Sequence, residues 1–270
     1  MNEKGRKKGN DIFVPLGTIS KKSAIITGIV SFGVIFAVWE LITRFGLVDT
    51  LFMPTPEETF ATAVDLFTNQ GFVHDILVTV ARVMIGFAIA ALFAIPLGIL
   101  IGVYAPVSAA LDPVLSFLRY LPASAFIPLF ILWIGIDEKE KVAVIILGSI
   151  SQLILMIAQS TREISKALIE VSYTLGTNRT NVIWKVILPK TMPSIVDTLR
   201  IVLGWAWTYI IVAELVGASS GIGYMIIQSQ RMLNTARIFV GILTIGLIGL
   251  VVDLLLKWLN KILFPWNVQK

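Results

Sequence analysis

The chain has 270 residues, of which 56% are hydrophobic and 14% are charged, and its mean hydropathy is +0.86. Soluble domains carry about 25% charged residues, so we expect an all-α protein whose main solvent is lipid. The absence of cysteine and the single histidine, His74, exclude disulfides, thiolate metal sites and histidine-rich metal sites. In a membrane protein the net charge of +5 matters through its placement, and we expect no nucleic-acid partner.

Apolar runs predict the membrane spans, because a helix needs about 20 mostly apolar residues to cross a bilayer. Six runs indicate one transmembrane domain over 23–266, with spans at about 23–42, 80–104, 117–135, 142–159, 194–216 and 238–259. The third run is short, and an alternative starts it near Leu115 with a bend at Pro122. Gly98 and Gly102 form a G-x-x-x-G pattern in the second run, which predicts close helix packing.

The distribution of basic residues predicts the orientation. Most of the 22 lysines and arginines lie in the tail 1–22, the loop 160–190 and the C-terminal end. Six spans place these three segments on one side, and the positive-inside rule then puts both termini in the cytoplasm of a multi-pass plasma or inner membrane protein. The tail 1–22 is too polar for a signal peptide, so we expect two cytoplasmic tails, 1–22 and 267–270.

A short amphipathic helix is predicted on the outer face, after the first span. Thr55 is a suitable N-cap, Pro56 fits the first helical position, and Glu57 and Glu58 place negative charge in the first turn.

The loop 160–190 has the sequence of two helices. Ser160 and Glu163 fit a capping box, which predicts a helix from Ser160 that ends at Gly176 in a left-handed conformation. A second short helix is expected from about Arg179, with Pro189 ending it.

Residues in this hairpin carry a resemblance to a known family. Glu170-Val171-Ser172, Gly176 and Leu188-Pro189 resemble the EAA loop of permease subunits of ABC-type importers, with Val171 and Ser172 in place of alanines. The resemblance implies a coupling helix that docks on a separate ATPase through these residues: Ile169, Glu170, Val171, Ser172, Tyr173, Gly176, Leu188 and Pro189. The alternative is an amphipathic helix lying on the membrane surface.

The resemblance also implies an assembly. It implies the type I ABC importer permease fold, a second copy of the permease, two ATP-binding subunits and an external substrate-binding protein. The chain contains no G-x-x-x-x-G-K-[ST] phosphate loop. We therefore expect no catalytic residue and no cofactor in this chain, with ATP and Mg²⁺ bound by the partner ATPase.

Two further segments, Arg119 to Gly135 and Ala213 to Met225, resemble permeases of the nitrate, sulfonate, taurine and bicarbonate group, most closely those of cyanobacterial nitrate importers. This implies import of a small inorganic oxyanion, nitrate or nitrite, with bicarbonate or sulfonate and taurine as alternatives.

Polar and aromatic residues within or near the spans are candidates for the translocation pathway: Arg82, Arg119, Trp205, Trp207, Tyr209 and Glu214. A charge at the bilayer centre costs at least about 2.5–3.5 kcal/mol, so Arg82 should face a cavity or a partner. Trp205 and Tyr209 share one helix face and Trp207 another. Either face is compatible with the pathway or with core packing. Glu214 has the wrong charge for an anion ligand, and we expect it to pair with a buried arginine or the backbone.

Two other classes of protein are alternatives: a secondary anion carrier or channel, and a hydrolase. A secondary anion carrier or channel needs buried acids, and the in-span acids are Glu40, Glu214 and Asp253. Of these, Asp253 is expected to pair with Lys257 at i, i+4. Gly217 to Gly221 formally matches G-x-S-x-G, but a hydrolase also needs a histidine base, and His74 lies far upstream.

Overall fold

The computed structural model describes residues 19–267, so the expected tails lie outside the described residues except at their inner ends. Within 19–267 every regular element is helical. The elements are α1 Lys21–Arg44, α2 Pro56–Asn69, α3 Phe72–Val103, α4 Ala105–Tyr120, η1 Ala123–Phe126, α5 Ile127–Ile134, α6 Glu138–Arg162, α7 Lys166–Thr174, α8 Arg179–Val182, η2 Ile183–Ile187, α9 Leu188–Gly217, α10 Ile222–Arg231, α11 Thr235–Leu263 and η3 Pro265–Asn267.

Five helical segments of the described chain are long and apolar enough to cross a membrane. They comprise α1, α3, α6, the continuous stretch Arg179–Gly217 and α11. A sixth span exists only if α4 and the η1–α5 segment count together, and these two meet at an angle of 83°. A single uninterrupted helix over 117–135 is therefore not found, and the alternative with a bend at Pro122 agrees with the structure, in which the preceding helix α4 begins earlier, at Ala105. Pro122 cannot continue the ladder of α4, and α5, at 8 residues, reaches only about 12 Å.

The centre of the bundle is the pair α3 and α6, which pack closely along their length. Glycines of α3 permit this approach, as the G-x-x-x-G pattern predicted. A Cβ atom on Gly98 would lie 2.7 Å from the Cβ of Ile157, and one on Gly86 would lie 2.8 Å from the Cβ of Ile145. Since real Cβ atoms do not approach so closely, only glycine fits at these two crossing points.

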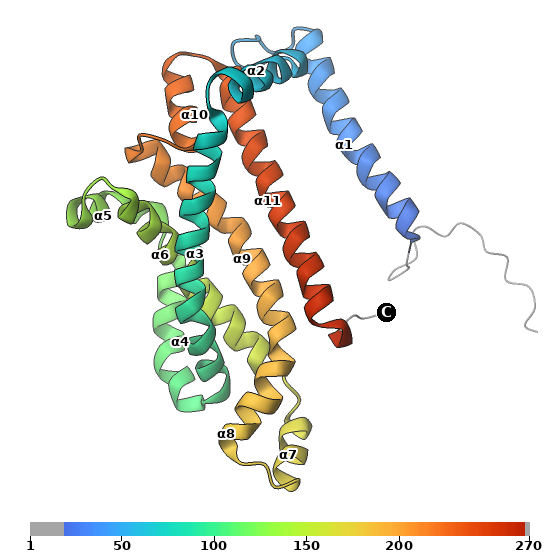
Figure 1. Ribbon diagram of the computed structural model, residues 1–270, viewed down its shortest axis with the longest axis vertical. Helices are drawn as coiled ribbons and strands as arrows, with labels where there is room; N and C mark the ends of the chain where they lie inside the picture. Colours follow the sequence, from blue (N-terminus) through green and yellow to red (C-terminus); the bar gives the residue numbers. More distant parts are fainter. Residues whose placement is uncertain (1–18, 268–270) are drawn as a thin grey trace, which may run out of the picture.

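The two ends of the bundle differ in structure (Figure 1). At one end, α2 lies across the tops of α3 and α11, and its N-cap is Thr55, whose side chain accepts the N–H of Glu58 at 3.1 Å. We call this the α2 end. At the opposite end, α7 and α8 form a hairpin, and we call this the hairpin end.

The helix α1 stands away from the bundle for most of its length (Figure 1), and none of its most apolar stretch is buried. It is fixed near the α2 end by Trp39, whose Nε1 donates to the carbonyl of Pro54 at 2.9 Å and whose ring stacks on Phe239.

Helix α9 starts earlier than the sequence predicted. Pro189 was expected to end the second hairpin helix, but it lies in the first turn of α9, which continues without a break from η2. The segment η2 is a π-helical turn. Its wider i→i+5 pattern accommodates the missing N–H and the ring of a proline one turn further on. The second helix of the hairpin, α8 with η2, and α9 therefore form one continuous helical segment, Arg179–Gly217, and α7 is joined to it through the turn at Gly176.

Candidate functional site

The hairpin begins after α6 has ended. Ser160 lies inside α6, which runs on to Arg162, and the new helix α7 starts at Lys166. The predicted capping box is therefore wrong. The Glu163 carboxylate accepts a hydrogen bond from Gln159 Nε2 at 3.1 Å instead. The reason is that the apolar run of α6 already supplies helical partners for the Ser160 backbone, which leaves no free N–H to cap.

The turn between α7 and α8 is confirmed as a glycine turn. Gly176 has φ +80°, which only glycine adopts without strain. Its N–H donates to the carbonyl of Tyr173 at 2.9 Å, and the N–H of Thr177 donates to Ser172 at 3.1 Å. This pair of bonds is the Schellman arrangement that terminates helices. The second helix is then capped by Asn178, whose side chain accepts the N–H of Asn181 at 2.8 Å.

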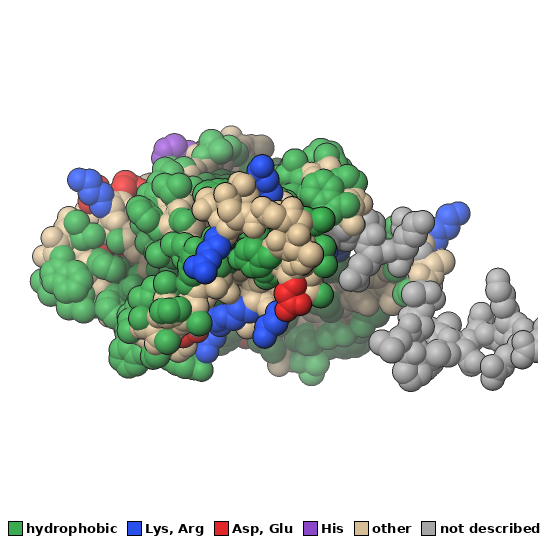
Figure 2. Space-filling view, turned by 90° about the horizontal axis from the view of Figure 1, so that it is seen from below, with side chains coloured by type: hydrophobic (Ala, Val, Ile, Leu, Met, Phe, Trp, Pro, Cys, Tyr) green, Lys and Arg blue, Asp and Glu red, His purple; other side chains and the backbone are tan. Residues whose placement is uncertain are grey.

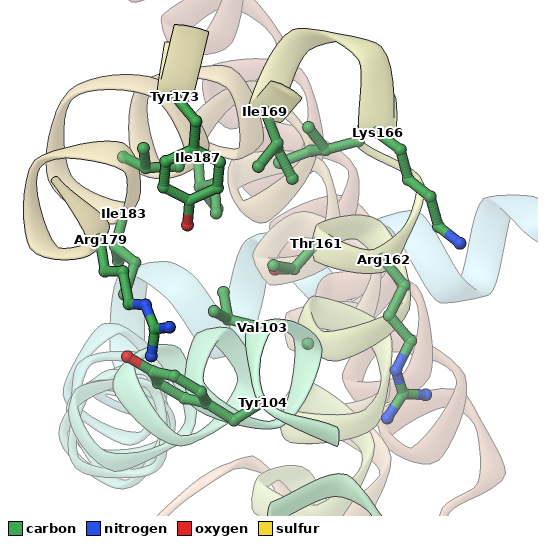
Figure 3. A pocket seen from close by; sticks show the side chains of 13 residues that line it. Val103, Tyr104, Thr161, Arg162, Lys166, Ile169, Tyr173, Arg179, Ile183 and Ile187 are labelled. Atoms are coloured by element: carbon green, nitrogen blue, oxygen red, sulfur yellow. The ribbon is translucent and has the colours of Figure 1, made fainter. Parts of the chain in front are cut away.

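The residues predicted to contact an ATPase are divided between two faces of the hairpin. Glu170, Val171 and Gly176 face away from the bundle, and Val171 is 55% exposed. Ile169 and Tyr173 instead line a cavity between the hairpin and the span ends (Figure 3). Of the remaining three, Ser172 is buried, Leu188 packs against the main core, and Pro189 is exposed at the start of α9.

The hairpin exposes large apolar side chains among charged ones. Leu168, Val171, Leu175 and Trp184 are all exposed, Leu175 at 79% and Trp184 at 64%. Trp184 was missed by the sequence analysis, although an aromatic residue between lysines and arginines in a short helix was a visible signal. Basic side chains outnumber acidic ones over this end of the molecule (Figure 2). An apolar patch of this kind usually marks an interface.

A buried charge cluster lies on the α2 side of the bundle. Arg82 of α3 is 3% exposed, and its Nη1 lies 2.7 Å from Oε1 of Glu214, which belongs to α9 and is 0% exposed. The same Nη1 donates to the carbonyl of Ser220 at 2.8 Å. The prediction that Glu214 pairs with a buried arginine is confirmed.

Glu138, at the start of α6, completes the contacts of Arg82. Its carboxylate accepts from both Nε, at 2.6 Å, and Nη2 of the guanidinium. The sequence alone did not indicate Glu138, because this residue stands in a run of charged residues typical of a solvated loop. Arg82 thus joins α3, α6 and α9 through two carboxylates.

The turn between α9 and α10 is fastened to the same cluster. Gly223 N–H donates to Glu214 Oε2 at 2.8 Å, and Gly221 N–H donates to Asp75 Oδ1 at 2.8 Å. Thr79 links the two, since its hydroxyl donates to Glu214 Oε1 at 2.9 Å and accepts the N–H of Ile222. Gly221 has φ +111°. The glycines that formally matched a hydrolase motif therefore form a turn between two helices, held by carboxylates.

A second ion pair, also absent from the sequence analysis, lies next to this cluster. Lys141 is 2% exposed and Glu140 is 0% exposed, with 3.4 Å between Nζ and Oε2. Lys141 also donates to the carbonyl of Gly217 at 3.1 Å, which ties the end of α9 to α6.

The aromatic candidates of α9 have different environments. Trp207 is 3% exposed within the main core, whereas Trp205 is 41% exposed. The ring of Tyr209 packs against Gly148 of α6. Core packing therefore accounts for Trp207 and Tyr209, and Trp205 is the one open to the surroundings.

Two other arginines of the spans, Arg119 and Arg200, lie outside the buried cluster. Arg119 is exposed at the end of α4, with its guanidinium carbon 5.0 Å from the centre of the Tyr120 ring. Arg200 lies 3.3 Å from Asp253 of α11. The predicted pairing of Asp253 with Lys257 is therefore wrong, because the guanidinium of a packed neighbouring helix reaches this carboxylate.

The described part of the chain offers no cluster of three or more His, Cys, Asp or Glu side chains that could hold a metal ion. Two carboxylates near the turn are fully buried, and each has a cationic partner: Arg82 for Glu214 and Lys141 for Glu140.

Comparisons with known proteins identify the family. Residues 94–266, more than half of the chain, match the model of the "binding-protein-dependent transport system inner membrane component" family. A probable ABC transporter permease of Brucella abortus (strain 2308) is 36% identical, over 91% of this chain and 98% of that protein. A putative aliphatic sulfonates transport permease of Bacillus subtilis is 33% identical, over 92% of this chain and 90% of that protein. A nitrate import permease of Leptolyngbya laminosa is 28% identical, over 87% of this chain and 86% of that protein.

Solved structures agree on the fold. The chain matches the methionine ABC transporter MetNI in inward-facing conformations with a TM-score of 0.59 and 20% identity, over 69% of this chain and 94% of that one. It matches a bacterial ABC transporter involved in alginate import with a TM-score of 0.57 and 18% identity, over 93% and 98%. The chain therefore belongs to the family of inner membrane components of binding-protein-dependent transport systems, and it is a multi-pass permease subunit of an ABC importer and not itself an enzyme.

Proposed function

We propose that this permease imports a small oxyanion and that its hairpin is the element on which a separate ATPase acts. The observation that carries the coupling role is the geometry of the hairpin. Its exposed apolar side chains lie beyond the ends of the spans, and its second helix, α8 with η2, continues into α9 without a break. A partner that binds the hairpin acts on α9 directly through Trp184 and through the Gly176 turn from α7.

The orientation and the assembly follow from the same proposal. The hairpin end is the cytoplasmic end, where the positive-inside rule expects its basic side chains. Two copies of the chain form the pathway, with two ATPase chains on the cytoplasmic side and a substrate-binding protein outside. ATP and Mg²⁺ are held by the ATPase chains.

For the substrate, a sulfonate is the first candidate and nitrate the second. The relative named for aliphatic sulfonates shares 33% identity with this chain, and the relative named for nitrate shares 28%. Both substrates are small anions whose charge is spread over three oxygens. The sulfonate adds a carbon chain. This order differs from the expectation that the family resemblance implied, which placed nitrate first.

The coupling role is tested with Gly176→Val. A side chain at φ +80° costs about 1–2 kcal/mol and displaces the hairpin turn. ATP-driven uptake by the reconstituted importer should be lost, while the amount of permease in the membrane is kept. Gly71→Val is the matched control, because Gly71 has φ +66° and open space around it at the α2 end. Undiminished uptake in Gly176→Val, or equal loss in both variants, would contradict the coupling role.

The substrate is tested by uptake of labelled ethanesulfonate and nitrate into liposomes that contain the full importer with its binding protein. Ethanesulfonate uptake should exceed nitrate uptake, and the reverse order would make nitrate the substrate. The permease alone in liposomes should give no gradient-driven uptake of either anion. If it does, the chain works as a secondary carrier.

A further inference from the structure

A cavity of about 500 Å³ separates the hairpin from the ends of the spans (Figure 3). One wall is formed by α3 and α6, at Gly102 to Tyr104, Thr161 and Arg162, and the opposite wall by α7, α8 and η2. The volume lies within the range of small-molecule pockets, about 300–1,000 Å³. On this side the hairpin therefore faces an open space and is not packed against the spans.

The lining of the cavity is apolar with a positive rim. Its apolar part consists of Val103, Ile164, Ile169, Val182, Ile183 and Ile187. Three lining side chains are basic, and no lining side chain is acidic. Arg162 is paired with Asp112 of α4 at 2.6 Å. Lys166 and Arg179 form no ion pair with any group in residues 19–267.

The polar groups are not spread evenly around the cavity (Figure 3). The guanidinium of Arg179 and the hydroxyl of Tyr104 point toward one another on one side, and the hydroxyl of Tyr173 points into the space beside them. Arg162 and Lys166 point away from the centre on the opposite side. One cation and two phenol groups thus lie on the same side of the cavity, next to isoleucines that line it (Figure 3).

From this arrangement we propose that the cavity binds an amphipathic organic anion. Its oxyanion head lies at Arg179 between the two tyrosine hydroxyls, because charge-assisted hydrogen bonds to a guanidinium are the stronger kind. Its short apolar body lies against the isoleucines of α7 and η2. A free alkyl sulfonate and the headgroup end of an anionic lipid share this chemistry.

Binding has a consequence for the hairpin. Since the ligand contacts both walls, it binds best to the arrangement in which hairpin and spans keep their present spacing, and it shifts the population toward that arrangement. Under the proposed coupling role, the partner ATPase hydrolyses ATP more slowly when the hairpin on which it acts is held in place. In this proposal the cavity is a regulatory site at the hairpin end of the permease.

The experiment measures binding to the complete permease–ATPase complex in phosphatidylcholine nanodiscs, with hexanesulfonate as the probe, by calorimetry. Hexanesulfonate should bind, and inorganic sulfate, which lacks the apolar body, should bind at least about tenfold more weakly. Arg179→Gln should weaken hexanesulfonate binding by about tenfold or more, and Ile183→Trp, which fills the cavity without changing charge, should also weaken it. Lys261→Gln, an exposed cation at the far end of α11, should leave the affinity unchanged.

Nanodiscs that contain phosphatidylglycerol distinguish the two sources of the ligand. If lipid occupies the cavity, hexanesulfonate binding falls in these nanodiscs and Arg179→Gln abolishes the difference. If a free anion is the ligand, the affinity is the same in both membranes. Either result supports the cavity as an anion site.

Two results overturn the inference. The first is that hexanesulfonate does not bind in phosphatidylcholine nanodiscs, where no anionic lipid competes. The second is that its binding is unaffected by both Arg179→Gln and Ile183→Trp. The ATPase rate of the same complex is recorded alongside, and it should fall as hexanesulfonate saturates the cavity. Binding that depends on Arg179 without any change in ATPase rate would uphold the site and contradict the coupling role of the hairpin.

Discussion

Removal of Arg82 should be among the most destabilising single changes in this permease. Arg82→Met leaves the Glu214 carboxylate, which is 0% exposed, without its cation. Loss of one partner of a buried ion pair costs about 3–5 kcal/mol. The carboxylate keeps the hydrogen bonds from Thr79 and Gly223 N–H, which favours the lower half of that range. We therefore expect a loss of about 3–4 kcal/mol.

The measurement is the unfolding of the purified importer in detergent at fixed pH. The stability of each variant is compared with that of the unchanged protein through the midpoint of the unfolding transition. The double variant Arg82→Met with Glu214→Gln removes both charges and should recover part of the loss, because no uncompensated charge remains. Arg44→Met is the control, since Arg44 is exposed at the end of α1, and it should change the midpoint little. If Arg82→Met behaves like Arg44→Met, or if the double variant is no better than the single one, the cluster does not stabilise the fold in this way.

Two further predictions concern the core. Gly98→Ala should lower the free energy of unfolding by about 1–3 kcal/mol, because its Cβ would lie 2.7 Å from the Cβ of Ile157. Gly246→Ala, in open space, should be neutral or stabilising. Thermal unfolding of the two variants checks this difference. Trp207→Ala should cost about 3–5 kcal/mol and Trp205→Ala within about 1 kcal/mol, since the two are 3% and 41% exposed; equal losses would contradict the assignment of Trp207 to the core.

Local signals in the sequence predicted the helices that depend on local physics. The Thr55 cap with Pro56 and two acids fixes the start of α2, and the long apolar runs coincide with long helices. Gly176 ends α7 as predicted, because a positive φ is a property of one residue. Predictions failed where two local signals competed. The capping box at Ser160 lost to the continuing apolar run of α6, and Pro189 was tolerated by a π-helical turn that no composition rule indicates.

The charge cluster was predictable only in part. A lone arginine within an apolar run must have a partner, and Glu214 was an available one. That Glu138 also binds Arg82 depends on how α6 is placed against α3, which a single sequence does not reveal. The same holds for Asp253, where the neighbour at i+4 was the obvious partner and the arginine of another helix is the actual one. Side-chain partners across helices are set by packing, and packing is not local.

Helix α9 offers a test of how the two ends of the permease communicate. Its 30 residues span about 45 Å, with the hairpin at one end and Glu214 near the other. Gly204 lies at mid-helix, exposed, with nothing within 4 Å of an added Cβ. Gly204→Pro therefore interrupts the helix without a clash against a neighbouring helix, at a cost of about 3 kcal/mol.

If α9 transmits motion as one rod, Gly204→Pro should leave the ATPase bound to the hairpin and uncouple it from import. ATP hydrolysis by the complex should continue while uptake into proteoliposomes falls at least about tenfold, because the hairpin end can then move while the half of α9 that carries Glu214 does not follow. Gly204→Ala is the control at the same position, and it should keep uptake, since alanine favours the helix by about 0.5–1 kcal/mol. Uptake by Gly204→Pro equal to that of Gly204→Ala, per complex inserted, would show that the rod is not needed and that motion passes through the contacts of α6 with α3 instead.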